Sequence, residues 1–356
     1  MKRYPFLDWL RGLAILIMIQ CHTFNSFTKA DLRPGGPYLL SQFVGGMAGP
    51  LFLFMAGMTS AFGIERAAAR EAAPLQRWLT ALRRAGYVLA IAYLFRFTNW
   101  LFSLPHADWH ELTKVDILNC MGAAMLLFSA CAAASDAWRV RLALIGTLVI
   151  AAVSPLIASV DWNHAPALLH DYLAPPNGTG RFPIFPYAAF LGFGLAIGAI
   201  VKRTAAERLD RLMQWSVIVG LTLILTGQYF AGVPYSLYQH SDFWSDSPTL
   251  VCIRLGVVLA LLSASYLWTA YRAAPRWSWL QTIGRNSLMV YWVHLMLVYG
   301  DILKRFKAAL NIPQTALAAL TVTILMVALS VVWFWWKGRA VTPAAYRAAA
   351  APGEPT

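Results

Sequence analysis

Long apolar runs recur along this 356-residue chain, and they constrain its fold more than any other feature. Several of them are roughly 18 to 24 residues long, which suits a helix that crosses a hydrocarbon core about 30 Å thick. Only 13% of the residues are charged, whereas a soluble domain carries about 25%. The pattern predicts an all-α, polytopic membrane protein.

Ten membrane spans account for these runs, and both termini are expected on the cytoplasmic side. Most of the 29 Lys and Arg residues then fall in the inside loops, as the positive-inside rule requires. The net charge of +13 therefore follows from topology, and nucleic acid is not expected as a partner. We expect the spans at about 6–26, 40–63, 83–103, 115–134, 141–160, 182–201, 215–233, 249–270, 285–303 and 315–336.

The segments outside the spans are short. We expect one transmembrane domain over residues 1–340, followed by an Ala- and Pro-rich disordered cytoplasmic tail at 341–356. The basic stretch 65–84 is predicted to lie along the lipid headgroups as a separate surface helix. The N-terminal run is interpreted as a retained helix of a multi-pass, bacterial-type inner-membrane protein, with a homodimer as a possible assembly.

The first span carries polar residues in the stretch "RGLAILIMIQCH". Arg11 and His22 are eleven residues apart, about three helical turns, so they share one face at a separation of roughly 16 Å. Asp8 and Asn25 extend this stripe by one turn at each end. Ionisable residues inside a membrane are functional candidates, because they are costly unless they face protein or water. The alternatives are that Arg11 pairs with Asp8 or reaches the headgroups, and that His22 only bonds a neighbouring helix.

The fourth span opens with "KVDILNCMG". Asp116 and Asn119 share a face at its outer end, at the depth expected for His22. A carboxylate there suits the orientation of an imidazole in acid–base catalysis. The alternative is that Asp116 is a boundary residue paired with Lys114.

The ninth span carries a polar stripe of its own. Ser287, Tyr291 and His294 follow each other at i, i+4 and i+7. Such a stripe suits the lining of a tunnel through the helix bundle, or hydrogen bonds between helices.

Three arginines map to the outer half of the membrane or to its outer edge, against the topology rule: Arg96, Arg181 and Arg254. They are expected to pair with Asp or Glu of the outside loops, or to receive anionic groups such as phosphate or an oxyanion. We find no phosphate-binding loop, nucleophile elbow or HExxH motif in a workable place, and we expect no metal site. These absences argue against an ATPase, a typical hydrolase and a metalloprotease.

Several stretches together resemble the transmembrane acyltransferase superfamily over roughly residues 5–300. They are "LDWLRGLAILIMIQCH", "GPLFLFMAGMTSAFGIER", "VDILNCMGAAMLL", "RFPIFPYAAFLGFGLAIGA" and "IGRNSLMVYWVHLML". The chain resembles the bacterial DUF1624 proteins, which are grouped with the catalytic domain of heparan-alpha-glucosaminide N-acetyltransferase, and more distantly the acyltransferase-3 family.

The resemblance implies transfer of an acyl group, usually acetyl, from cytoplasmic acyl-CoA to a hydroxyl or amine on the far side of the bilayer. It assigns the catalytic histidine to His22 and the arginine of the same motif to Arg11. In the lysosomal enzyme the histidine lies after the first span, but the loop "TKADLRPGGPYLLSQ" has none. The acyltransferase-3 pattern is therefore the better guide, and transfer to heparan is not implied.

Two functions follow as hypotheses. In the first, the chain is an acyl-CoA-dependent O- or N-acyltransferase for an extracytoplasmic glycan or glycolipid, with His22 as general base or as an acyl-accepting nucleophile. In the second, it is a transporter or flippase for a polar or lipid-linked substrate, and its buried charges form a substrate path or a proton relay. For the enzyme, the orienting residues are Asp116 and Asn119, the acyl-CoA-binding residues are Arg11, Arg77, Arg83, Arg84, Tyr291 and His294, and the acceptor-binding residues are Arg96, Arg181 and Arg254.

Overall fold

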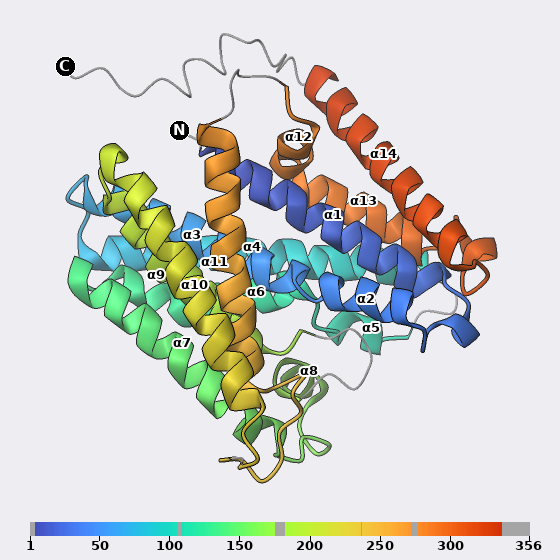
Figure 1. Ribbon diagram of the computed structural model, residues 1–356, viewed down its shortest axis with the longest axis horizontal. Helices are drawn as coiled ribbons and strands as arrows, with labels where there is room; N and C mark the ends of the chain where they lie inside the picture. Colours follow the sequence, from blue (N-terminus) through green and yellow to red (C-terminus); the bar gives the residue numbers. More distant parts are fainter. Residues whose placement is uncertain (1–3, 105–107, 175–181, 236, 272–276, 337–356) are drawn as a thin grey trace. The chain divides into compact units, whose positions relative to one another are not determined.

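The computed structural model describes residues 4–104, 108–174, 182–235, 237–271 and 277–336. This part of the chain is all-helical and contains no strand (Figure 1). The predicted tail at 341–356 and the predicted acceptor residue Arg181 lie outside the described residues.

Within the described ranges, six helical stretches are long and apolar enough to cross a membrane, and six predicted spans coincide with them. They are Gly36–Ala68, Asp136–Ala158, Ile184–Arg203, Ala206–Ala231, Pro248–Ala270 and Ile312–Trp336. The other four predicted spans are helical too, as α1 (Pro5–Phe27), α4 (Pro74–Phe102), α6 (Ile117–Leu127) and α13 (Ser287–Tyr299). Helices α6 and α13 have only 11 and 13 residues. The total of ten spans and the cytoplasmic termini stay predictions.

The separate surface helix expected at 65–84 is wrong. Helix α3 (Ala48–Ala68) takes its first residues, and α4 then runs unbroken from Pro74 to Phe102. Proline is favoured at the first position of a helix, where its missing N–H costs nothing, and no helix-breaking residue follows it before the apolar run. The basic residues around position 80 therefore stand on the first turns of a long helix.

The chain divides into two compact units. One comprises Met1–Leu51 together with Leu261–Thr356, and the other comprises Phe52–Ala260. In the first unit, α1 packs against α2 (Gly36–Gly45), α12 (Trp279–Arg285), α13 and α14 (Ile312–Trp336). Figure 1 shows α1 in dark blue beside the orange and red helices of the C-terminal part. The N-terminal helix is thus held by segments that lie more than 250 residues later.

Two glycines allow α1 and α12 to touch backbone to backbone. A Cβ added to Gly284 would lie 1.9 Å from the backbone oxygen of Asp8, and one added to Gly12 would lie 2.0 Å from that of Leu280. No side chain fits in either place, because real Cβ atoms do not approach other atoms so closely. Helices that pack through small residues can approach closely in this way.

This contact gives a first prediction. We expect Gly284→Ala to destabilise the folded protein by about 3 kcal/mol or more, since the methyl group must push α12 away from α1. Gly36→Ala is the control, because a Cβ there meets no atom within 4 Å. The midpoint of thermal unfolding in detergent measures both. Equal midpoints for the two variants would show that the contact does not matter.

The ninth predicted span, 285–303, corresponds to α13, and a break at its start separates α13 from α12. α12 ends at Arg285 and α13 begins at Ser287, and Asn286 between them has φ −106° and ψ 25°, outside the helical region. Its side-chain amide donates to the carbonyl oxygens of Thr282 and Ser330, each at 3.3 Å. The break separates the turn that contacts the start of α1 from the helix that carries His294.

In the second unit, α7 (Asp136–Ala158) packs against α9 (Ile184–Arg203), and α6 packs against α4 and α9. The unit also contains α5 (His110–Thr113), α8 (Ala167–Leu173), α10 (Leu209–Ala231) and most of α11 (Pro248–Ala270). A five-residue 3₁₀ turn, Phe128–Ala132, continues α6. Close approaches recur here, since a Cβ on Gly194 would lie 2.0 Å from the backbone oxygen of Phe54.

Candidate active site

His22 and His294 form a hydrogen-bonded pair in the first unit. Nδ1 of His22 lies 3.0 Å from Nε2 of His294, and Nδ1 of His294 lies 2.7 Å from the carbonyl oxygen of Val290. His294 is fully buried in α13, whereas His22 in α1 is partly exposed. The partner of His22 is thus a residue that the sequence assigned to the tunnel for the acyl donor.

Aromatic rings surround the pair. The Tyr299 ring meets His22 edge-on with ring centres 5.4 Å apart, and the Tyr291 ring meets His294 edge-on at 5.9 Å. Among the described residues, no group hydrogen-bonds Nε2 of His22. The second nitrogen of this partly exposed imidazole therefore has no hydrogen-bond partner in the described part of the chain.

A chain of polar side chains continues from this point. Asn25 Nδ2 donates to the Tyr299 hydroxyl at 3.1 Å, and the Tyr38 hydroxyl donates to Asn25 Oδ1 at 3.3 Å. Arg33 Nη2 donates to the backbone oxygen of Asn25 at 3.0 Å. Asn25 and Tyr299 are exposed, so hydroxyl and amide groups are accessible next to His22.

Arg11 pairs with Asp8 at the other end of α1. Its Nη1 lies 3.4 Å from Asp8 Oδ1, and the second carboxylate oxygen of Asp8 accepts from Arg285 Nε at 3.2 Å. Asp8 is 5% exposed and bridges two arginines. Asp8 contacts α12, and His22 and Asn25 contact α13. The polar stripe of α1 therefore faces these two helices.

Asp116 and Asn119 form a capping box at the start of α6. One oxygen of Asp116 accepts the backbone N–H groups of Leu118 and Asn119 at 2.9 and 3.2 Å, and Asn119 Oδ1 accepts from the backbone N of Asp116. This arrangement satisfies donors that a helix end otherwise leaves unpaired. Asp116 also pairs with Arg96 Nη2 at 3.3 Å instead of with Lys114, which pairs with Glu111. The capping role is structural, and the catalytic role expected for the two residues stays a prediction.

Arg96 and Arg254 are the two described arginines among the three that the sequence places in the outer half of the membrane. Each has a partner within the second unit. Arg96 reaches Asp116, as described above, and Arg254 hydrogen-bonds the Tyr187 side chain. Arg96 thus has a carboxylate partner, as expected, whereas the partner of Arg254 is a phenol. Acceptor binding by either residue stays a prediction.

A pocket of about 550 Å³, counting the part open to solvent, lies in the second unit. Arg77 and Arg84 of α4 line it together with Ser60, Thr80 and Ser129. Its apolar walls come from Ile64, Met125, Phe128, Leu191 and Leu195. The site therefore combines two cations with an apolar interior. Arg83, the third arginine predicted for acyl-CoA, is exposed and does not line this pocket.

The two pocket arginines differ in their contacts. Arg84 donates to the backbone oxygen of Thr59 at 3.0 Å and to its hydroxyl at 3.3 Å. Arg77 donates from Nη2 to Ala133 O at 3.4 Å, while its Nε is buried and finds no acceptor within the described part of the chain. A buried donor without a partner is unfavourable unless a ligand supplies the acceptor.

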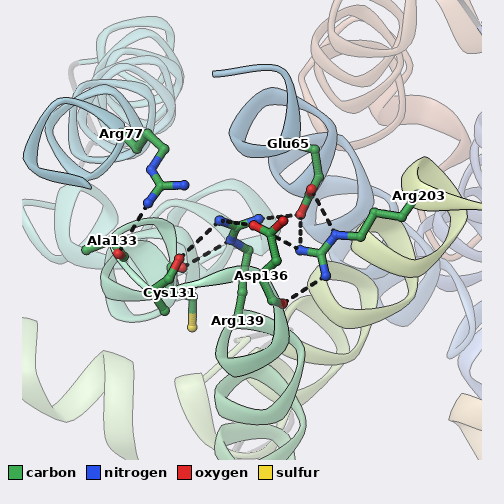
Figure 2. A network of polar contacts seen from close by, with 8 residues as sticks. Glu65, Arg77, Cys131, Ala133, Asp136, Arg139 and Arg203 are labelled. Atoms are coloured by element: carbon green, nitrogen blue, oxygen red, sulfur yellow. Dashed lines mark hydrogen bonds and ion pairs between the residues drawn. The ribbon is translucent and has the colours of Figure 1, made fainter. Parts of the chain in front are cut away.

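A cluster of charged residues joins the ends of α3, α7 and α9 (Figure 2). Glu65 of α3 accepts from Nη1 of Arg139 in α7, and from Nε and Nη2 of Arg203 in α9 at 2.9 and 2.5 Å. Arg139 is completely buried and Glu65 is 8% exposed. Figure 2 shows the Arg139 guanidinium between Glu65 and the backbone oxygen of Cys131, which lies in the 3₁₀ turn. One carboxylate thus compensates two arginines in a buried place.

A family model describing an acyltransferase domain matches residues 4–336, nearly the whole chain. The chain belongs to the acyltransferase-3 family. Its all-helical fold and apolar helices agree with a multi-pass membrane acyltransferase. No curated protein matches the chain significantly. Among the family resemblances, the one to acyltransferase-3 is confirmed, and those to the DUF1624 proteins and to the heparan-modifying enzyme stay predictions.

Among the residues with described positions, no group of three His, Cys, Asp or Glu side chains is arranged to hold a metal ion. The chemical groups that the site offers are imidazoles, phenols, amides and guanidinium groups.

Sequence reasoning missed several residues of the acyltransferase, among them Arg285, Tyr299, Glu65, Arg139 and Arg203. Glu65 did carry a signal, because it is the only acidic residue between positions 52 and 70. The arginines carried none, because basic residues on the cytoplasmic side are already expected from topology.

Proposed function

We propose that this acyltransferase moves an acyl group, in most cases acetyl, from cytoplasmic acyl-CoA to a hydroxyl or amine of an extracytoplasmic glycan or glycolipid. The observation that carries the proposal is the partly exposed His22, whose Nδ1 is bound to His294 and whose Nε2 has no partner within the described residues. The proposal includes the finer family resemblance, a bacterial-type inner membrane and cytoplasmic termini.

In the proposed reaction, His22 is the general base. Nε2 takes the proton of the acceptor O–H or N–H group while the acceptor atom attacks the thioester carbonyl carbon. The tetrahedral intermediate collapses as the C–S bond breaks, and the CoA thiolate takes the proton from the imidazolium. The products are an ester or amide and free CoA. In the variant with His22 as nucleophile, an acyl-imidazole forms first and the acceptor then attacks it.

The donor end of the reaction is assigned to the pocket of the second unit. CoA carries several phosphate groups, and guanidinium groups bind phosphate through paired hydrogen bonds. Arg77 Nε, which is buried and has no acceptor among the described residues, supplies one such donor, and Arg84 supplies a second cation. The apolar walls suit the uncharged part of the cofactor.

Removal of either pocket arginine is expected to weaken acyl-CoA binding. We expect Arg77→Gln and Arg84→Gln each to raise the Kd for radiolabelled acetyl-CoA about tenfold or more, because a charge-assisted hydrogen bond contributes about 1.5 to 3 kcal/mol. Arg83→Gln is the matched control, since it makes the same charge change on the same helix outside the pocket. Equilibrium binding to purified protein measures all three. Equal weakening by Arg83→Gln, or no acetyl-CoA binding by the wild type, would count against the donor assignment.

The acceptor end is assigned to the surroundings of His22. Tyr38, Asn25 and Tyr299 supply hydroxyl and amide groups connected by hydrogen bonds, and the Tyr299 ring offers an apolar face. Such groups suit a polyhydroxylated acceptor, because its hydroxyls need partners and its ring faces pack on aromatic side chains. The arginines Arg96, Arg181 and Arg254 remain further candidates for acceptor binding, and a homodimer remains a possible assembly.

A further inference from the structure

We propose that His294 is a positioning residue that fixes the tautomer and the ring orientation of His22. The inference rests on the proposed function, in which His22 Nε2 is the base. It replaces the expectation that Asp116 or Asn119 orients His22, and it gives His294 a role other than lining a donor tunnel.

The first step concerns the proton on His294. Its Nδ1 lies 2.7 Å from the carbonyl oxygen of Val290 in the preceding turn of α13. A carbonyl oxygen only accepts hydrogen bonds, so Nδ1 must carry the proton. The backbone of the helix thereby selects one tautomer of His294.

The second step concerns the charge of the pair. His294 is 0% exposed, and the side chains whose rings contact the pair are the uncharged Tyr291 and Tyr299. Within the described residues, no carboxylate pairs with either imidazole. A buried charge without a partner is strongly unfavourable, so the fully buried His294 is neutral at rest. Nε2 of a neutral His294 with its proton on Nδ1 is then an acceptor.

The third step concerns the proton on His22. Since Nε2 of His294 accepts, Nδ1 of His22 must donate across the 3.0 Å contact. A neutral His22 with its proton on Nδ1 has a free electron pair on Nε2. This is the form that a general base needs, and it is fixed before any substrate binds.

The geometry of the two rings supports a directed hydrogen bond. The ring planes differ by only 5°, and the ring centres are 5.3 Å apart. That separation equals the N···N distance plus the two ring radii, so the centres and the bonded nitrogens lie nearly on one line. The rings are therefore placed edge to edge in one plane, the alignment in which an N–H···N bond is strongest. A rotation of the His22 ring would break it.

The experiment compares His294→Phe with His294→Gln. Phe keeps the flat apolar shape but removes the acceptor, whereas the side-chain oxygen of Gln lies near the former position of Nε2. We expect kcat to fall about 10²- to 10⁴-fold in His294→Phe with little change in the acceptor KM, because a base in the wrong tautomer loses catalysis and leaves binding intact. His294→Gln is expected to restore most of kcat.

A spectroscopic readout makes the inference independent of activity. In protein labelled with ¹⁵N-histidine, we expect the His22 signal, assigned by its loss in His22→Gln, to show a proton on Nδ1 in the wild type. In His294→Phe we expect it to shift toward the Nε2-protonated form. A wild-type His22 protonated on Nε2, or an unchanged tautomer in His294→Phe, would overturn the inference. Because no substrate is present, these outcomes are distinct from a failure of the proposed acyl transfer, which leaves the tautomer as predicted.

Discussion

Glu65→Ala is expected to destabilise the folded protein by about 3 to 5 kcal/mol. The reason is the burial of Arg139, which has no exposed surface and shares the Glu65 carboxylate with Arg203. Removal of Glu65 leaves the buried Arg139 with only the largely exposed Asp136 as a charged partner, and breaking a buried ion pair in this way costs far more than the pair itself contributes. The three helix ends that meet at this carboxylate are expected to separate first on heating.

Asp136→Asn is the matched control for this prediction. Asp136 also contacts both arginines, at 3.3 and 3.7 Å, but its side chain is 63% exposed. Exposed ion pairs contribute about 0 to 1 kcal/mol, so the expected effect is small. The midpoints of thermal unfolding in detergent compare the two variants. Similar midpoints for both would show that burial of the Glu65 cluster does not govern stability.

The fold was predictable where a single local pattern decides it. The length of the apolar runs located the helices that are long and apolar enough to cross a membrane. The stripe from Asp8 to Asn25 indicated a face of α1 that contacts protein. The eleven-residue spacing of Arg11 and His22 needs only the helical repeat. Such features depend on neighbours in sequence and are therefore readable from the chain.

The partners across this face were not predictable. His22 bonds His294, which is 272 residues away, and Asp8 bonds Arg285, which is 277 residues away. The polar residues around 287–294 were recognised as a stripe, but no periodicity says which helix a stripe faces. Contacts of this kind depend on how α1 packs against α12 through Gly12 and Gly284. This packing is visible only in the folded chain.

Helix boundaries followed only partly from the sequence patterns, since the ninth span was placed from 285, next to the break at Asn286, whereas the start of α4 at Pro74 was missed. The break at Asn286 follows from side-chain bonds to Thr282 and Ser330, of which the second is 44 residues away. Asp116 shows the same difficulty, because a carboxylate before an apolar run fits both an active site and a helix cap. In the structure, the Asp116 carboxylate caps the start of α6.

His22→Ala is expected to lower the rate of acyl transfer by about 10²- to 10⁴-fold while acetyl-CoA binding stays unchanged. A positioned base contributes about this factor to proton transfer in the transition state, and the pocket arginines belong to the other unit. His164→Ala, which alters an exposed histidine, is the control and is expected to keep the wild-type rate.

The most direct measurement uses membrane vesicles whose cytoplasmic face points outward. Radiolabelled acetyl-CoA is added outside, and the label in glycan and glycolipid fractions is followed over time for wild type and His22→Ala at equal expression. The proposed function predicts transfer by the wild type and at most about one hundredth of that rate for His22→Ala. Transfer at the wild-type rate by His22→Ala would contradict the role of His22 as the catalytic base.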